Sequence, residues 1–330
     1  MTKKPEDFSE FIRTLGRGPT KSRHLTREEA QEAFAGALSG EMSDLQIGAL
    51  LLLLRYRSED AAELAGIVEA IRNSLDMEPI TEYQDLIDWP SYSAGKSRGL
   101  PWFLLSAKLL AENGHKVFMH GYNSHMENGI PTEDCLAAID EAPCGSLAET
   151  AGKLDNDNFA FLPLRNFCPR ILEFLEMRNL LGVRSIINTA VRLINPLHAD
   201  TLFLGIFHPP YIQLNREAAQ ILAQPRLGVI KGGGGEAERT PFKSIALFTV
   251  IDGTEEKSSW PAFLKESDQK ERIVTLDHFR EVWYGKTEDP VALRTILGTA
   301  AQALYLKGVA RDAQDAEVLA LSYWEKHLAS

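Results

Sequence analysis

Short apolar runs alternate with helical patterns over most of this chain, from about Asp85 onward. Apolar runs at residues 86–89 and 116–119 flank a helical pattern at residues 102–110. This alternation is typical of a parallel sheet whose strands are joined by helices. It therefore predicts an α/β domain. Its further strands are expected at residues 159–162, 201–207, 227–230 and 245–251, and its two closing helices at about 291–307 and 312–328.

The first eighty residues have a purely helical pattern. Thr26 with Glu29, and Ser43 with Gln46, fit the capping box, in which side chains and backbone amides pair reciprocally at a helix start. We expect a third helix to begin at Ser58. Residues 47–54 are apolar all round, which predicts a helix buried on several sides, in a core or a subunit interface.

The predicted fold class is α/β, with a small all-helical N-terminal domain and a larger α/β domain that contains a mainly parallel sheet. The helical pattern returns between residues 167 and 193. We therefore assign residues 1–80 to the helical domain, completed by helices around 167–193, and residues 81–166 and 194–330 to the α/β domain. With 330 residues, 44% of them hydrophobic, the chain can bury a large core.

The sequence has neither a membrane-type segment nor a cysteine pattern that predicts a metal. Apolar stretches stay below the ~18 residues of a membrane span, and the N-terminal residues lack the apolar core of a signal peptide. We therefore expect a cytoplasmic protein with no membrane partner. Cys135, Cys144 and Cys168 are odd in number and lack metal-type spacing, so we expect buried thiols rather than disulfides or a zinc site.

Charge is distributed unevenly along the chain. The formal net charge of −11 argues against wholesale attraction to nucleic acid. However, residues 1–27 carry seven basic side chains against three acidic ones, and residues 165–192 carry five arginines against two glutamates. Solvated helix faces would explain either stretch alone. Two such stretches in an acidic chain favour an anionic ligand.

Three loops follow predicted strands, at residues 91–96, 120–123 and 232–235, and the last is four consecutive glycines. In parallel sheets, ligands collect where strands end. Glycine amides in such a loop can contact phosphate but cannot hold a metal. The alternative to a phosphate-binding loop is a flexible turn between a strand and a helix.

His120 and His208 could act as general bases. No serine or carboxylate stands at a spacing that would orient them, so we expect structural histidines.

The order of these pieces resembles the anthranilate phosphoribosyltransferase family, whose fold the pyrimidine nucleoside phosphorylases share. The likeness rests on residues 25–30 with 46–49, on Met119-His120-Gly121-Tyr122-Asn123, and on residues 178–188 with Asn195-Pro196. The resemblance implies a helical domain hinged to an α/β domain and a homodimer joined through the helical domains. It also implies that Arg178 corresponds to the arginine that contacts the anthranilate carboxylate.

The chain departs from the family's transferases in three loops. The glycine-threonine-glycine-glycine-aspartate loop that holds diphosphate is replaced by a stretch with bulky Tyr92 and with Pro90, which has no amide hydrogen. Met119 replaces a lysine before the His-Gly motif. Gly235 and Glu236 stand where an Asp-Glu pair would hold magnesium, so one carboxylate is missing.

These departures remove groups that would neutralise a leaving diphosphate, so we expect the transferase activity to be lost. No catalytic residue, metal or cofactor is then predicted. The chain is similar to a branch of the family that binds nucleic acid without the transferase motifs. Our primary prediction is therefore a homodimer that binds single-stranded nucleic acid without sequence preference. Its expected anion-binding residues are Lys96, Arg98, Arg165, Arg170, Arg178, Arg184 and Lys231.

The former substrate cleft is predicted from the same three loops. Tyr92, Trp102 and Tyr122 could stack on bases, although aromatic side chains more often lie in a core. For Arg178 and Arg184, pairing with Glu173 or Glu176 is the structural alternative. The cleft residues are Ser91, Tyr92, His120, Gly121, Asn123, Gly233, Gly234 and Glu236.

Two other functions remain open at this point. The first is a glycosyl or phosphoribosyl transferase that uses phosphoribosyl pyrophosphate and magnesium, favoured by the retained Arg178, Asn123 and Glu236. The second is a sensor that binds a small aromatic acid or a nucleotide in the hinge cleft and changes its dimer geometry.

Overall fold

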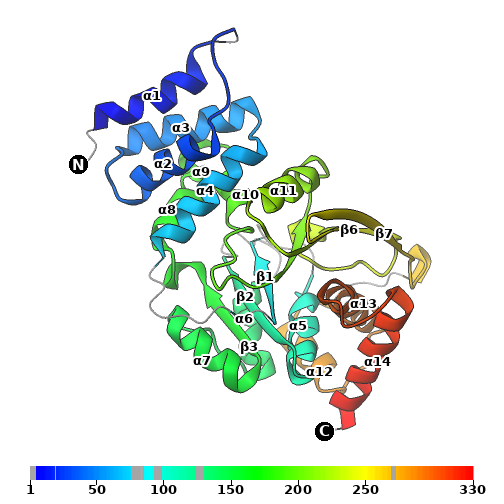
Figure 1. Ribbon diagram of the computed structural model, residues 1–330. Helices are drawn as coiled ribbons and strands as arrows, with labels where there is room; N and C mark the ends of the chain where they lie inside the picture. Colours follow the sequence, from blue (N-terminus) through cyan, green and yellow to red (C-terminus); the bar gives the residue numbers. More distant parts are fainter. Residues whose placement is uncertain are drawn as a thin grey trace. The chain divides into compact units, whose positions relative to one another are not determined.

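The computed structural model describes residues 5–18, 20–75, 83, 85–92, 99–122, 130–268 and 273–329 (Figure 1). The chain divides into two compact units. The helical unit comprises Met1–Glu78, Phe167–Pro196 and Leu214–Ala223, and the α/β unit comprises Pro79–Asn166, Leu197–Gln213 and Gln224–Ser330. Residues 214–223, which the sequence places with the α/β domain, cluster with the helical unit.

The helical unit begins with four helices, and the starts of α2, α3 and α4 are encoded locally by capping boxes. Both predicted capping boxes are present, at Thr26 and at Ser43. The next helix does not begin at Ser58 as expected. Ser58 ends the preceding helix with a φ of 64°, and Asp60 is the N-cap, paired with Glu63 in a third capping box. The helices are α1 (Pro5–Gly16), α2 (Arg27–Leu38), α3 (Asp44–Arg57) and α4 (Ala61–Ser74), followed by α8 (Pro169–Glu176), α9 (Arg178–Leu181) and α10 (Ile187–Ala190).

Close packing between α2 and α4 is possible because position 66 lacks a side chain. A Cβ atom on Gly66 would lie 2.1 Å from the carbonyl oxygen of Arg27.

The apolar run in α3 is buried on one side through Ile47 and Leu50, but Leu52 is 40% exposed. Within this chain, α3 is therefore not buried on all sides.

The α/β unit contains a seven-stranded sheet in the order β3-β2-β1-β4-β5-β6-β7, in which the first five strands are parallel. The predicted fold class is confirmed. The strands are β1 (Leu86–Ser91), β2 (Lys116–Gly121), β3 (Phe159–Pro163), β4 (Thr201–Ile206), β5 (Arg226–Lys231), β6 (Ile245–Ile251) and β7 (Thr254–Trp260).

Helices and short 3-10 turns connect these strands or follow the last of them. The connections are α5 (Trp102–Glu112), α6 (Thr132–Leu136), η1 (Ala137–Ile139), α7 (Leu147–Asp157), η2 (Leu164–Asn166), α11 (Pro210–Ile221) and η3 (Gly233–Gly235), and the elements after β7 are η4 (Glu266–Asp268), α12 (Leu276–Trp283), α13 (Pro290–Lys307) and α14 (Ala313–Ala329). Both predicted closing helices are present as α13 and α14. Among the described residues, no helix is long and apolar enough to cross a membrane.

The antiparallel end of the sheet includes a strand that the sequence pattern did not indicate. β6 and β7 form a hairpin whose two-residue turn is Asp252-Gly253, with φ values of 48° and 79°. Positive φ at both turn residues defines the type I′ geometry that fits the twist of a hairpin. β7 is an edge strand and its sequence, TEEKSSW, is mostly exposed.

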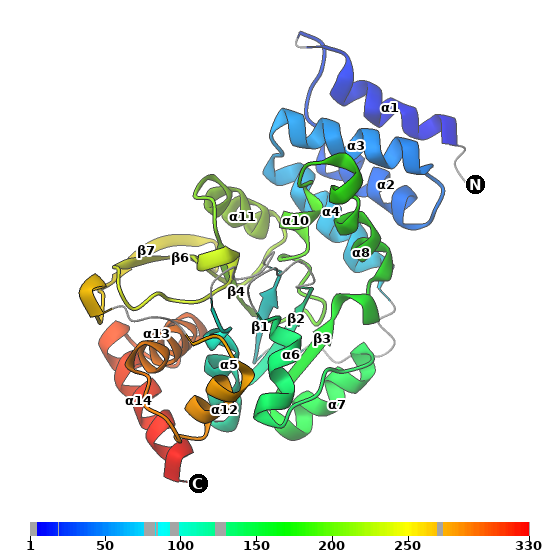
Figure 2. The same cartoon turned by 180° about the vertical axis from the view of Figure 1, so that it is seen from behind.

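Successive strand residues alternate between the two faces of the sheet. Trp89 and Met119 are register partners on β1 and β2 and lie in the main apolar core. That core also contains α5, α12, α13 and α14, which group together in both views (Figure 2). The residues before and after these two, including Asp88 and His120, therefore belong to the opposite face.

Candidate functional site

A buried network of three side chains lies where β1 and β2 end. The Tyr92 hydroxyl lies 2.7 Å from Nδ1 of His120, and Nε2 of His120 lies 3.0 Å from Oδ1 of Asp88. Asp88 and His120 are fully buried, and Tyr92 is 7% exposed. Both contacts of His120 are hydrogen bonds in the tautomer in which the Tyr92 hydroxyl donates to Nδ1 and the Nε2–H group donates to Oδ1 of Asp88.

The sheet register explains why these residues meet. In the parallel pair β1–β2, Asp88 is opposite Phe118 and Pro90 is opposite His120. Asp88 and His120 are thus diagonal neighbours on one face. The expectation that no carboxylate orients His120 is wrong, because the orienting residue lies on the adjacent strand, 32 positions away. His120 nevertheless has the satisfied, buried environment of a structural histidine.

A second network joins the ends of β1 and β5. Ser91 Oγ donates to Glu236 Oε1 at 3.1 Å and lies 3.0 Å from the Thr132 hydroxyl. Glu236 is 1% exposed and Ser91 is fully buried. In the strand order, β2 and β3 lie to one side of β1, whereas β4 and β5 lie to its other side. Ser91, at the end of β1, therefore lies near the position where the strand order reverses. Ligands of open α/β sheets bind at that position.

The four-glycine segment is a tight turn that positions Glu236. A Cβ atom on Gly232 would lie 1.6 Å from the carbonyl oxygen of Glu236, and one on Gly205 would lie 1.9 Å from its carbonyl carbon. Gly234 and Gly235 have φ values of 68° and 86°. An irregular segment and then β6 follow, so the alternative of a turn between a strand and a helix is wrong. The glycines permit close backbone packing that buries the carboxylate.

The other cleft residues have similarly enclosed surroundings. A Cβ atom on Gly121 would lie 2.0 Å from the carbonyl oxygen of Ser91, so glycine allows the ends of β1 and β2 to approach. Met119 is fully buried in the apolar core. Trp102 begins α5 and stacks on Phe279, consistent with a core role rather than a base-stacking one. Asn123 lies outside the described residues.

The predicted anion-binding residues fall in both units, and two of them are occupied by acidic partners. Arg165 forms a two-pronged ion pair with Glu133, at 2.5 and 2.8 Å, and this hydrogen bonding raises the pKa of the arginine. Arg170 pairs with Glu173 and lies 3.6 Å from Asp44. In the structural alternative, Glu173 was expected to pair with Arg178 or Arg184.

The remaining basic residues differ in accessibility. Lys231 and Arg184 are exposed and Arg178 is half-buried. Lys96 and Arg98 lie outside the described residues. Arg165 and Lys231 belong to the α/β unit, whereas Arg170, Arg178 and Arg184 belong to the helical unit.

The formal charge also differs between the units. The helical unit contains 15 basic and 17 acidic residues, and the α/β unit contains 20 basic and 29 acidic residues. The helical unit is therefore almost neutral, and most of the negative charge of the chain belongs to the α/β unit. An anionic ligand would be repelled less by the helical unit than by the α/β unit.

Sequence reasoning missed two residues of the site, Asp88 and Thr132. Asp88 was predicted only as part of the strand at residues 86–89, with no role in the site. Alternation along β1 and β2 could have placed it beside His120. Thr132 follows a loop, and its contact with Ser91 is tertiary, so periodicity carries no signal for it.

These features define a class of protein: a mostly parallel α/β unit with a strand-order reversal at the site, accompanied by a separate helical unit. The chain belongs to a glycosyl transferase family. The model of the "Glycosyl transferase family, helical bundle domain" matches residues 9–75, and that of the "Glycosyl transferase family, a/b domain" matches residues 103–326.

Similar proteins include both named and uncharacterised members. An uncharacterised protein of Aquifex aeolicus is 30% identical over 66% of this chain, and the uncharacterised protein YbiB of Escherichia coli is 32% identical over 62%. The matched region spans 65% of the length of each of these two relatives. An anthranilate phosphoribosyltransferase of Lactococcus lactis is 28% identical over 89% of this chain and 82% of the relative.

Solved structures show the same fold across nearly the whole chain. The anthranilate phosphoribosyltransferase of Thermus thermophilus has a TM-score of 0.75 at 22% identity, with 98% of both chains covered. The enzyme of Saccharomyces cerevisiae, in complex with phosphoribosyl pyrophosphate and magnesium, has a TM-score of 0.78 at 14% identity, covering 98% of this chain and 95% of the other. At these identities the likeness concerns the fold.

Proposed function

We propose that this protein binds single-stranded nucleic acid without sequence preference and does not catalyse phosphoribosyl transfer. The observation that carries the second part is the internal engagement of Glu236. Its carboxylate is 1% exposed and accepts a hydrogen bond from Ser91. A magnesium ion needs several oxygen ligands with near-ideal octahedral geometry, usually including waters. Reaching Glu236 would require the turn to open and the Ser91 contact to break.

The residues present fit a magnesium-diphosphate group poorly for a second reason. The Tyr92 side chain occupies the end of β1 and is hydrogen-bonded to His120. The side chain of Met119 is enclosed in the apolar core and carries no charge. Transfer from a diphosphate donor depends on fixed positive charge around the leaving group. We therefore derive no catalytic step through magnesium or phosphoribosyl pyrophosphate.

The nucleic-acid part of the proposal is supported by the accessible basic residues. Exposed Arg184 and half-buried Arg178 belong to the nearly neutral helical unit, and exposed Lys231 is the last residue of the parallel strand β5. Guanidinium and ammonium groups bind phosphates irrespective of base sequence. Arg165 and Arg170 form ion pairs with Glu133 and Glu173, and each is expected to contribute less than it would without that pair.

Fluorescence anisotropy with a labelled 20-nucleotide single strand tests this proposal at 50 and 200 mM salt. We expect binding at micromolar protein in low salt and a steep loss of affinity at high salt, because phosphate binding releases counterions. Each of the substitutions Arg178→Ala, Arg184→Ala and Lys231→Ala should weaken binding. Each should also reduce the slope of log K against log salt concentration by about one. Arg311→Ala, which removes an exposed arginine with no predicted role, is the matched control.

A second candidate function is a transferase that uses phosphoribosyl pyrophosphate and magnesium. The names of the relatives favour it, including the anthranilate phosphoribosyltransferase of Lactococcus lactis, which matches over 89% of this chain. Calorimetry with phosphoribosyl pyrophosphate and magnesium separates the two functions. Saturable binding would support the transferase, whereas no heat of binding at millimolar ligand would oppose it.

We also propose that the protein forms a homodimer through its helical unit. Leu45 and Tyr56 on α3 are 84% and 88% exposed, and Leu180 on α9 is 88% exposed. Position 48 of α3 lies close to Leu181 of α9, so both helices contribute to one apolar region. A second copy of this chain would bury it, as the family resemblance implies. Light scattering should give a dimer for the wild type and a monomer for Tyr56→Glu with Leu180→Glu.

A further inference from the structure

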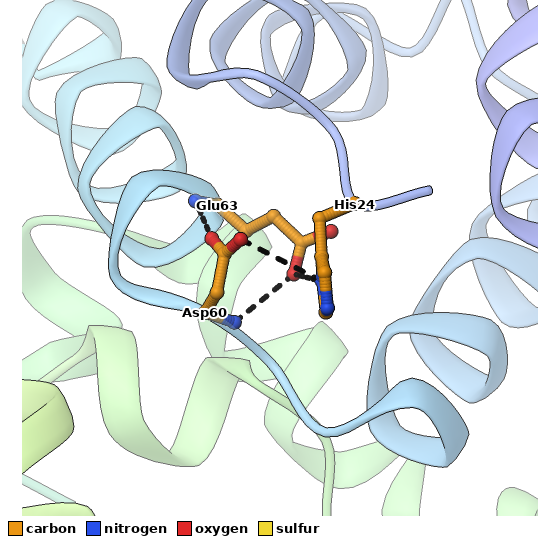
Figure 3. Close-up of side chains that lie close together, drawn as sticks. All are labelled: His24, Asp60 and Glu63. Carbon is orange, nitrogen blue, oxygen red and sulfur yellow. Dashed lines mark hydrogen bonds and ion pairs between the residues drawn. The ribbon is translucent and has the colours of Figure 1, made fainter. Parts of the chain in front are cut away.

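Three side chains in the helical unit converge on one point, away from the strand-end networks described above. His24 lies just before α2, whereas Asp60 and Glu63 lie at the start of α4. Nδ1 of His24 is 3.1 Å from Oε2 of Glu63 and 3.7 Å from Oδ2 of Asp60. Each residue has one potential metal-ligand atom, and these three atoms all lie within 4.8 Å of one another (Figure 3).

Backbone amides hold both carboxylates in place. Oδ1 of Asp60 accepts from the Glu63 amide at 2.8 Å, which leaves Oδ2 directed toward the imidazole. Glu63 accepts from the amides of Leu25 and Asp60, at 2.9 and 3.1 Å. The Leu25 and Glu63 amides bind the oxygens that face away from His24, whereas the Asp60 amide donates to Oε2 of Glu63, the oxygen that faces His24. Hydrogen bonds to the outer oxygens of ligand groups orient them at metal sites.

The charges of the three groups are compatible with a cation between them. Glu63 is fully buried, and a second carboxylate, Asp60, faces the same ring nitrogen. A single Nδ1–H group can serve Glu63 well but reaches Asp60 only at 3.7 Å. The neighbouring arginines are engaged elsewhere, Arg23 with Glu29 and Arg27 with Glu69.

We propose that His24, Asp60 and Glu63 bind a divalent transition-metal ion, with zinc the best match. Zinc accepts imidazole nitrogen and carboxylate oxygen in four-coordinate sites, and water can complete such a set. The His24 and Asp60 side chains are 37% and 39% exposed, which gives the ion and a water access to the site. The bound ion would join the segment before α2 to the start of α4 and so stabilise the helical unit.

Titration of the EDTA-dialysed full-length protein with zinc chloride, followed by calorimetry, tests this inference. We expect one zinc per chain in the wild type. Asp60→Ser removes the ligand oxygen but keeps an N-cap hydroxyl, so the helix start should survive. His24→Gln removes the imidazole while leaving an amide that can still donate to Glu63. Each substitution should weaken zinc binding at least about 10-fold.

Asp44→Ser is the matched control, because it removes one negative charge from the first turn of α3, outside the cluster. It should bind zinc as the wild type does. Circular dichroism establishes that each variant is folded. The inference would be overturned if the wild type showed no one-to-one zinc site, or if Asp60→Ser and His24→Gln both bound zinc with wild-type affinity. The first result would identify the cluster as a hydrogen-bonded helix cap.

Discussion

Adding one methyl group at Gly232 should unfold the α/β unit at a markedly lower temperature. Gly232 has φ −98° and ψ 146°, which any residue can adopt, so the effect of Gly232→Ala is purely steric. The new Cβ would lie 1.6 Å from the carbonyl oxygen of Glu236, whereas ordinary contact begins at 3.4 Å. The two backbone segments must therefore separate by about 1.8 Å along that contact.

The expected loss of stability has two sources. Overpacking a closely fitted segment costs about 1–3 kcal/mol. Moving Glu236 also strains its hydrogen bond with Ser91, and hydrogen bonds to charged groups contribute about 1.5–3 kcal/mol. A total near 3 kcal/mol corresponds to a drop in melting temperature of roughly 6–12 °C for a domain of this size.

Gly233→Ala, at the neighbouring residue, is the matched control. A Cβ atom there would have no heavy atom within 4 Å, so the change should be neutral or stabilise by up to about 1 kcal/mol. Tryptophan fluorescence during heating reports on the correct unit, because all five tryptophans belong to the α/β unit. Equal melting temperatures for the two variants would refute the close packing of the glycine turn.

Three further predictions follow from buried titratable groups. Glu317→Gln should lower the free energy of unfolding by about 1–3 kcal/mol in urea titrations, because it leaves the fully buried Arg239 guanidinium without its charged partner. Burial raises the pKa of the Cys168 thiol to about 11, so a thiol reagent at pH 8 should modify this cysteine only at the rate of unfolding, and rapid modification in the native state would contradict its burial. Burial alone would lower the pKa of His327, but its hydrogen bonds, first to Glu112 and then to a backbone carbonyl, raise it overall. A raised folded-state pKa stabilises the protein below the ordinary value of 6.5, and this contribution is lost as pH rises through the folded-state pKa. Glu112→Gln should therefore weaken the fall of the free energy of unfolding above pH 6.5.

The sequence predicts most of the fold because its strands are buried. β1 to β6 are largely apolar runs, which periodicity detects. β7 escapes detection because an edge strand exposed to water can be polar, although the Asp252-Gly253 pair was a usable hairpin signal. The misplaced start of α4 has a local cause, since Asp60 with Glu63 caps a helix as well as serine does.

The candidate site was less predictable because its contacts are tertiary. Sequence loops identified Tyr92, His120 and Glu236, but their partners lie on other strands. Asp88 reaches His120 only through the β1–β2 register. The close approach of Gly232 to the Glu236 backbone likewise depends on the folded turn. For the basic residues, the sequence overestimated the charge that is free to bind an anion. Local charge counts could not reveal that Glu133 pairs with Arg165.

The zinc-ligand cluster shows why spacing alone gives an incomplete view of metal chemistry. The cysteine pattern gave no reason to expect a metal, and His24 is separated from Asp60 by 36 positions. The segment before α2 and the start of α4 come together because α2 and α4 pack closely through Gly66. Only that packing brings an imidazole to two carboxylates.

The central claim is that this family member binds a polyanion and has lost the transfer reaction. Its most direct test is anisotropy of a labelled single-stranded 20-mer at 50 mM salt, with phosphoribosyl pyrophosphate and magnesium added as competitors. We expect micromolar binding of the oligonucleotide, almost unchanged by millimolar phosphoribosyl pyrophosphate with magnesium. Absence of oligonucleotide binding, or its full displacement by micromolar phosphoribosyl pyrophosphate with magnesium, would contradict it.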